Sequence, residues 1–276
     1  MMLSWSQAAV LALFLAGFGV LVRPAGRHWL VVATAVGRET ALVLALFSFW
    51  QLAGEVSLLR LTAARGHGLW IWHVERALHF PSEVTVQRWF LPYPTIIKLF
   101  NVYYATVHFP ALIIFLIWCF FRHREHYPSV RNTVAILTAS CLLIQLIPVA
   151  PPRMFGNFGF VDTALRYGQS VYGVVGSGFA DQLSAMPSVH VGWAVLIAVF
   201  VLRISRSQWR WLVLVHTSLT VLIVTVTANH WWLDGVVAVM LLGLAIVTER
   251  WSRALVTRFR ASRVQAPSRE TIGALQ

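Results

Sequence analysis

Charged residues are scarce in this chain of 276 residues: only 12% are Asp, Glu, Lys or Arg, whereas 58% are hydrophobic. A soluble domain carries roughly 25% charged residues, so the composition excludes an ordinary water-soluble protein. Lysine is nearly absent, with Lys98 alone, and the formal net charge of +12 comes almost wholly from arginine. Because the arginines flank apolar runs, they indicate a membrane protein and not a partner of nucleic acid.

Cysteine is also rare, with only Cys119 and Cys141, and both lie inside apolar runs. Two cysteines so placed exclude a disulfide framework and a cysteine-based zinc site. Their setting predicts small buried side chains.

Long apolar runs, in contrast, are abundant, and seven of them are long enough, or nearly so, to cross roughly 30 Å of hydrocarbon. They lie at 5–22, 30–53, 95–121, 132–150, 187–204, 210–228 and 231–249. We therefore predict an all-α integral membrane protein with a six-helix transmembrane core, one extra N-terminal span, and interfacial helices within 54–94. Its predicted parts are an N-terminal span and short loop (1–29), a membrane-embedded catalytic domain (30–250) and a basic cytoplasmic tail (251–276).

Arginines cluster after the first, third, fifth and seventh runs. Cytoplasmic loops of membrane proteins are enriched in arginine and lysine, so these four segments should face the cytoplasm. The segments 54–94 and 151–186 then face outside. The sequence thus predicts a multi-pass protein of the cell membrane.

Polar residues gather at the outer ends of three runs. Three prolines end the fourth run and deliver Arg153 to the rim, while Ser188 and His190 open the fifth run. His230 follows His190 by 40 residues, which suits one helix inward and one back at roughly 1.5 Å per residue. Asp234, four residues further on, shares a helix face with His230. All five residues should therefore meet on the extracytoplasmic rim.

Residues of these types can cleave a phosphate ester by covalent catalysis with neither a metal nor another cofactor. A histidine backed by a carboxylate keeps one ring nitrogen protonated and the other free to attack. A second histidine can protonate a leaving oxygen, and an arginine binds phosphate oxygens and stabilises their charge. Ser188 and the first amides of its helix add anion-binding donors.

The same segments resemble the motifs of the type-2 phosphatidic acid phosphatase superfamily. MPSVH at 186–190 is similar to its second motif, Pro-Ser-x-His, and NHWWLD at 229–234 to its third, His-x-x-x-Asp. VAPPR at 149–153 resembles the arginine-bearing first motif, most closely in the inositolphosphotransferase-like branch that includes inositol phosphorylceramide synthase. The resemblance implies a phosphatase-type transmembrane core.

The resemblance also implies a role for each residue. His230 attacks phosphorus to form a phosphohistidine, Asp234 orients it, and His190 protonates the leaving group and then activates water or an acceptor alcohol. Arg153 and Ser188 hold the phosphate. The implied partner is a lipid phosphate or phospholipid, with a polyol or sugar as acceptor in the transferase case.

Two positions depart from the pattern of that superfamily. Leu146 stands where the first motif usually has a lysine, and Val224 where the third usually has an arginine. Arg166 and Lys98 are candidates to replace these charges.

Another candidate group lies in the third run, where Asn101, Tyr104 and His108 share one helix face. They are expected either to line the substrate pocket or to join helices by hydrogen bonds.

Two further classes of function stay open. His190, His230 and Asp234 could form the two-histidine, one-carboxylate metal site of a metal-dependent membrane hydrolase. Polar groups in a membrane can also belong to a non-catalytic lipid transporter or scaffold, although here they gather on one rim instead of along a path.

Overall fold

The computed structural model describes residues 3–22, 27–58, 61–169 and 183–265. Over these residues the regular elements are all helices, and the one β-type contact is an isolated bridge between Val149 and Ser184. The predicted all-α class is therefore confirmed. Parts of the predicted outer loop (170–182) and of the tail (266–276) lie outside the described residues.

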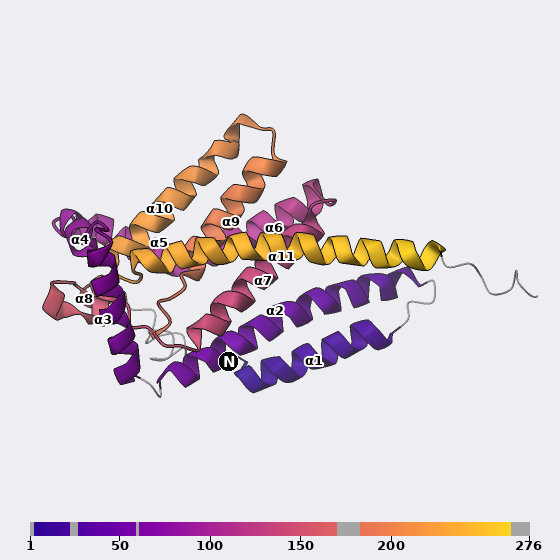
Figure 1. The fold of residues 1–276 in the computed structure, drawn as a ribbon, viewed down its shortest axis with the longest axis horizontal. Coiled ribbons are helices and arrows are strands. Elements are labelled where there is room, and N and C mark those ends of the chain that lie inside the picture. The colour runs from indigo at the N-terminus through magenta and orange to yellow at the C-terminus, as the bar shows by residue number, and fades with distance from the viewer. Residues whose placement is uncertain (1–2, 23–26, 59–60, 170–182, 266–276) are drawn as a thin grey trace, which may run out of the picture.

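In the described parts of the chain, the helices include two antiparallel hairpins and one long helix, with six further helices between the hairpins in sequence. They are α1 (Trp5–Leu21), α2 (His28–Leu58), α3 (Leu61–Ala77), α4 (Glu83–Phe90), α5 (Pro94–Thr106), α6 (His108–Arg122), α7 (Tyr127–Gln145), α8 (Thr163–Arg166), α9 (Val189–Ile204), α10 (Leu212–Val226) and α11 (Trp232–Gln265). Figure 1 shows the α1–α2 and α9–α10 hairpins and the long α11, which packs on α7 and α9. Helices α3, α4 and α8 gather at the end of the bundle where α11 begins.

Within the described residues, three helical segments are long and apolar enough to cross a membrane: His28–Leu52, Gln208–Val226 and Trp232–Arg258. The bent pair α5–α6 makes a fourth if it is one span, and α1 and α9 are apolar but shorter. These helices indicate a membrane protein. The count of a six-helix core plus one span, and the division at 29/30 and 250/251, stay predictions; α11 runs through residue 250 without a break.

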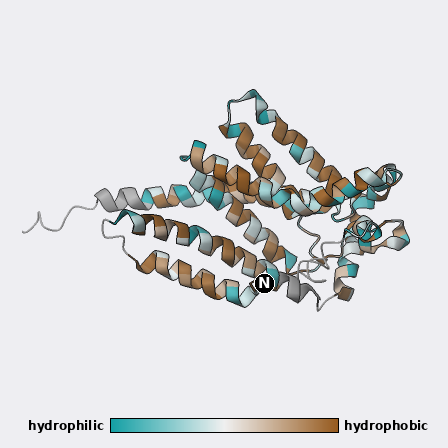
Figure 2. Cartoon of the chain, turned by 180° about the vertical axis from the view of Figure 1, so that it is seen from behind, coloured by the Kyte–Doolittle hydropathy of each residue, from teal (hydrophilic) through white to brown (hydrophobic). Residues whose placement is uncertain are grey.

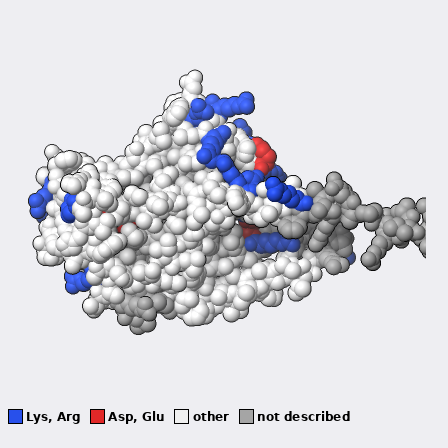
Figure 3. Space-filling view, in the orientation of Figure 1, with Lys and Arg blue, Asp and Glu red and all other residues white. Residues whose placement is uncertain are grey.

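The surface has the character expected next to lipid. Hydrophobic residues cover the long helices (Figure 2), and many large apolar side chains are exposed, among them Phe14, Phe121 and Met240. On the face drawn in Figure 3, charged side chains lie at the left end and in a second group to the upper right of the centre, and the surface between the two groups is almost free of charge. Such an uncharged belt matches the hydrocarbon layer of a bilayer.

The run predicted as one helix over 95–121 is instead two helices, α5 and α6, bent by 50° at Val107. Pro110 explains the break, because its ring cannot donate a hydrogen bond and clashes with the carbonyl group four residues earlier, on Thr106. The bend places His108 at the start of α6, where it is 5% exposed.

A buried aromatic cluster supports the end of the bundle that carries the VAPPR, MPSVH and NHWWLD segments. Trp231 is 2% exposed, packs edge-on against Phe160 and donates from Nε1 to the Ala150 carbonyl (3.0 Å). Gly68 of α3 lies so close that a Cβ there would be 2.7 Å from Ala150 O and 2.8 Å from the Phe155 ring. Helix α3 therefore packs directly against the segment that carries Arg153.

Candidate active site

Main-chain hydrogen bonds join the three motif segments into one frame. These bonds run from Val149 N to Leu183 O (2.7 Å), from Ala185 N to Val149 O (3.2 Å), from Arg153 N to Ala228 O (2.9 Å) and from Ser188 N to Asp234 O (3.1 Å). Segments that are far apart in the sequence are thus held in fixed register by backbone atoms alone.

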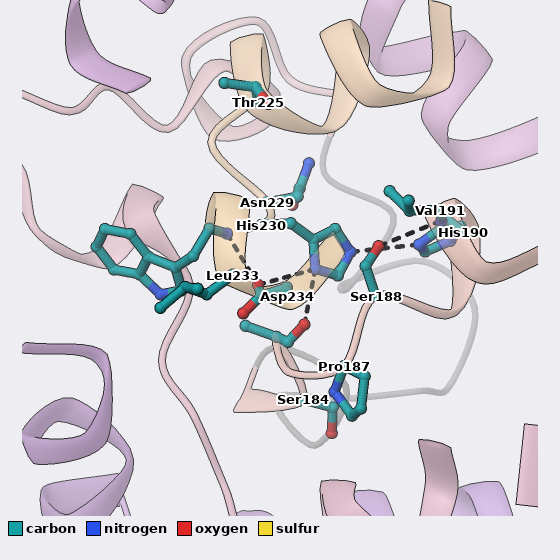
Figure 4. Close-up of polar contacts among 12 residues, drawn as sticks. Ser184, Pro187, Ser188, His190, Val191, Thr225, Asn229, His230, Leu233 and Asp234 are labelled. Carbon is teal, nitrogen blue, oxygen red and sulfur yellow. Dashed lines mark hydrogen bonds and ion pairs between the residues drawn. The ribbon is translucent and has the colours of Figure 1, made fainter. Parts of the chain in front are cut away.

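His230 lies at the centre of this frame, in the turn between α10 and α11 (Figure 4). Its Nδ1 is 2.7 Å from Ala185 O and 3.3 Å from Asp234 Oδ2, and its Nε2 is 3.3 Å from His190 Nδ1. Because Nδ1 faces two oxygen acceptors, we assign the ring proton to Nδ1. That tautomer leaves a lone pair on Nε2.

The imidazole of His230 is 5% exposed. Burial, reinforced by the nearby positive charge of Arg153, lowers the pKa of His230 to about 4, against the opposing hydrogen bond to Ala185. The ring is therefore neutral at pH 7, which is the state that a nucleophile requires.

Asp234 is completely buried and serves two groups at once. Its Oδ2 accepts from Trp231 N (2.8 Å), directly before α11, and lies against His230 Nδ1. A carboxylate at a helix N-terminus is stabilised by the aligned peptide dipoles. The same side chain thus caps the helix and orients the imidazole.

Ser188 caps the helix that carries His190. Its buried hydroxyl accepts from Val191 N (3.3 Å), and Gln145 Nε2 donates to the neighbouring Pro187 carbonyl (3.2 Å). These contacts fix the start of α9 opposite His230. The phosphate-binding role of Ser188 stays a prediction.

Arg153 is 8% exposed and packs against the turn that carries His230. Its Nη1 donates to Asn229 Oδ1 (2.5 Å), and its Nε is 3.7 Å from Asp162 Oδ2. Asn229 in turn donates to Thr227 Oγ1 (2.8 Å). The guanidinium group is thereby anchored to Asn229, the residue directly before His230.

Asn101, Tyr104 and His108, which the sequence predicts to share one helix face, have different neighbours in the structure. The Tyr104 and His108 rings lie 4.7 and 4.6 Å from the His190 ring, centroid to centroid. Asn101 instead donates to Gln169 Oε1 (3.1 Å) and accepts from Thr163 Oγ1 (2.9 Å). The structure therefore brings Tyr104 and His108, but not Asn101, to the two histidines.

The candidates for replacing the missing charges lie elsewhere. Lys98 and Arg166 are exposed and flank the ring of Tyr167, at 5.5 and 5.8 Å from its centroid. In the described part of the chain, the contacts of these two cations are with the Tyr167 ring and not with His190 or His230.

Three buried polar residues escaped the sequence analysis. Asn229 stands directly before His230, and Glu75 and Glu83 are both fully buried behind the turn at 231–234. Glu75 Oε1 accepts from Leu233 N (2.8 Å). The only local signal was acidic residues inside otherwise apolar, amphipathic helices, which is also typical of an ordinary interfacial surface.

Among the described residues, no group of three or more His, Cys, Asp or Glu side chains is arranged to hold a metal ion.

Comparison with known proteins gives one positive finding. No curated protein and no solved structure gives a significant match. A family model described as the PAP2 superfamily matches residues 69–248, which is more than half of the chain. The matched segment contains the whole arrangement around His190 and His230, and the chain therefore belongs to the PAP2 superfamily.

Proposed function

We propose that this membrane protein cleaves lipid phosphates or phospholipid headgroups through a covalent phosphohistidine on His230, without a metal. The observation that carries the proposal is the His230 ring: neutral, with Nδ1 held by Ala185 O and Asp234, and Nε2 facing His190. Membership of the PAP2 superfamily suggests a phosphatase-type activity on lipid phosphates, which supports the general class.

In the first step, His230 Nε2 attacks phosphorus, and the bond from phosphorus to the leaving oxygen breaks. The negative charge of the bound phosphate favours the imidazolium form of His190, which gives a proton to that oxygen and becomes neutral. Since the two histidines are hydrogen-bonded to each other in the free protein, the phosphoryl group replaces this bond when it enters. Arg153 neutralises the negative charge that accumulates on the phosphoryl oxygens.

In the second step, His190 takes a proton from the acceptor hydroxyl, whose oxygen attacks phosphorus and breaks the bond to His230. Water as acceptor makes the protein a phosphatase, and a polyol or sugar makes it a phosphotransferase. The VAPPR segment favours the inositolphosphotransferase-like alternative. Tyr104 and His108, whose rings pack against His190, are placed to line the acceptor side.

We further propose that the site faces the extracytoplasmic side of the cell membrane. It lies at the end of the bundle where α9 and α11 begin, beside α3 and α4 (Figure 1). The arginine-rich segments that follow α6, α9 and the apolar part of α11 lie at the other ends of those helices. Arginine-rich loops favour the cytoplasm.

The test is turnover in detergent with a strong chelator, for the wild type and His230→Ala. Phosphatidic acid, polyprenyl phosphate and phosphatidylinositol are offered, each with and without inositol or a glycan, and products are identified by mass spectrometry. Free phosphate from the wild type alone indicates a phosphatase, and a new phosphodiester that requires the acceptor indicates a transferase.

The chelator in this experiment, together with a lipid-flux assay in liposomes, separates the other classes of function. Activity abolished by the chelator and restored by a metal would support the metal-dependent hydrolase. Lipid flux in liposomes without phosphate release would support the transporter. Full turnover by His230→Ala would refute the phosphohistidine.

A further inference from the structure

Two fully buried carboxyl groups, Glu75 on α3 and Glu83 on α4, lie next to a single cation. Arg76 Nη2 is 3.1 Å from Glu83 Oε2 and 3.9 Å from Glu75 Oε2. Arg76 also lies over the Trp72 ring, which keeps its guanidinium group in place. Two buried negative charges against one positive charge are unfavourable, so the pair is expected to carry one proton.

The hydrogen bonds of these two carboxyl groups agree with one shared proton. Glu75 Oε2 and Glu83 Oε1 are both buried and accept no hydrogen bond from any donor in the described structure. A proton held between the two carboxyl groups satisfies both at once. Burial, together with the hydrogen bond and charge of Glu83, raises the pKa of Glu75 to about 9, so this proton is retained at pH 7.

The other oxygen of Glu75 contacts the turn that carries His230 and Asp234. Glu75 Oε1 accepts from Leu233 N (2.8 Å), the residue between Trp232 and Asp234 in the first turn of α11. On the other side of this turn, Asp234 Oδ2 accepts from Trp231 N. Two carboxyl groups thus accept from two amides, those of Trp231 and Leu233, at the N-terminus of α11, where negative charge is favoured.

We infer that Glu75 and Glu83 form a single positioning unit, one shared proton and one negative charge, that fixes the turn carrying His230 and Asp234 from behind. The inference rests on the proposed function of His230. The charged groups that face the pair are Arg76 from α3 and Asp234 from α11. Loss of the shared proton adds a negative charge near Asp234 and sets the two carboxylates against each other, which displaces Leu233.

Glutamine substitutions test the unit without changing its shape. In Glu75→Gln the amide oxygen still accepts from Leu233 N, and the amide nitrogen replaces the shared proton by donating to Glu83. This variant should keep wild-type kcat at pH 7. The wild type should lose kcat above about pH 9, whereas Glu75→Gln has no such proton to lose and should stay active there.

Two variants should be impaired at every pH. Glu75→Ala loses the bond to Leu233, and the double variant Glu75→Gln/Glu83→Gln keeps the size and shape of both side chains but removes the negative charge. A lost hydrogen bond to a charged group corresponds to about 10- to 100-fold, expected here in kcat with KM unchanged. The matched control is Glu249→Gln, an equally buried carboxyl further along α11. Wild-type kcat in folded Glu75→Ala and in the double variant would overturn the inference.

Two spectroscopic measurements do not depend on turnover. The infrared carbonyl band of a protonated carboxylic acid should be present in the wild type at pH 7 and absent from Glu75→Gln. The ¹⁵N resonances of His230 should shift in Glu75→Ala and in the double variant but not in Glu249→Gln. If the wild type shows the band and the variants show the shifts, but no lipid is turned over, the proposed function is refuted and the positioning unit stands. A missing band or unshifted resonances would refute the positioning unit.

Discussion

Replacing Asp234 with asparagine removes a negative charge from the site while it keeps the shape of the side chain. Asp234 is fully buried, and its Oδ2 lies 2.8 Å from Trp231 N and 3.3 Å from His230 Nδ1. The asparagine oxygen can still accept from Trp231 N, so the first turn of α11 should survive. What is lost is the charge that supports His230 as it becomes positively charged during attack.

The size of the loss follows from the second acceptor of His230. In a serine protease triad, where the carboxylate alone fixes the imidazole tautomer, the same change costs about 10⁴-fold. Here Ala185 O is closer to Nδ1, at 2.7 Å, and keeps the tautomer after the substitution. The remaining loss is one charge-assisted hydrogen bond, about 1.5–3 kcal/mol, or about 10- to 150-fold in kcat.

The assay is steady-state release of phosphate or phosphodiester product by Asp234→Asn in detergent, with chelator present. KM should stay the same, because Asp234 is too deeply buried to touch substrate. Glu249→Gln on the same helix is the control for removing a buried carboxylate charge. A loss of 10⁴-fold or more would show that the carboxylate fixes the tautomer and that Ala185 does not; wild-type kcat would remove Asp234 from the mechanism.

Three further outcomes are expected. His190→Ala should lower kcat on a lipid phosphate by about 10²- to 10⁴-fold. With a nitrophenyl phosphate, whose leaving group needs no proton, an acid quench of this variant should trap more phosphohistidine than with the lipid phosphate. An equal loss of kcat with both substrates would contradict the role of His190 as the acid. Arg153→Lys keeps the charge but loses the planar donors that meet Asn229, and should lower kcat/KM by about 10-fold or more, measured with soluble short-chain substrate; an unchanged value would exclude phosphate binding by Arg153. The proposed nucleophile is the neutral form of His230, whose pKa is about 4. On the acid side, kcat/KM should therefore stay constant until the pH drops toward 4, and a midpoint near 6.5 would contradict the burial of this ring.

The sequence was informative where chemistry and helix length act locally. Apolar runs placed the helices, and the 40-residue spacing placed His190 and His230 at the same end of a helix pair, where the structure has them 3.3 Å apart. The catalytic roles of these residues stay predictions. The break at Val107 was also encoded locally, in Pro110, but the strong apolar character of 95–121 masked it.

Long-range packing decided what the sequence could not show. Asn101 has the right spacing to join Tyr104 and His108, yet Thr163 and Gln169 approach it from a distant segment and take its hydrogen bonds. Glu75 lies in an amphipathic helix and resembles a surface residue. Its burial depends on α4 and on the turn before α11, and no local pattern predicts that contact.

The main-chain bonds between the motif segments have a consequence for altering this protein. Since Val149, Leu183 and Ala185 are joined through backbone atoms, exchanging side chains around the site leaves the scaffold intact. Tyr104 and His108 belong to α5 and α6, outside that scaffold. Under the proposed function, variation at these two positions is therefore a route to a redesigned acceptor preference with the backbone frame unchanged.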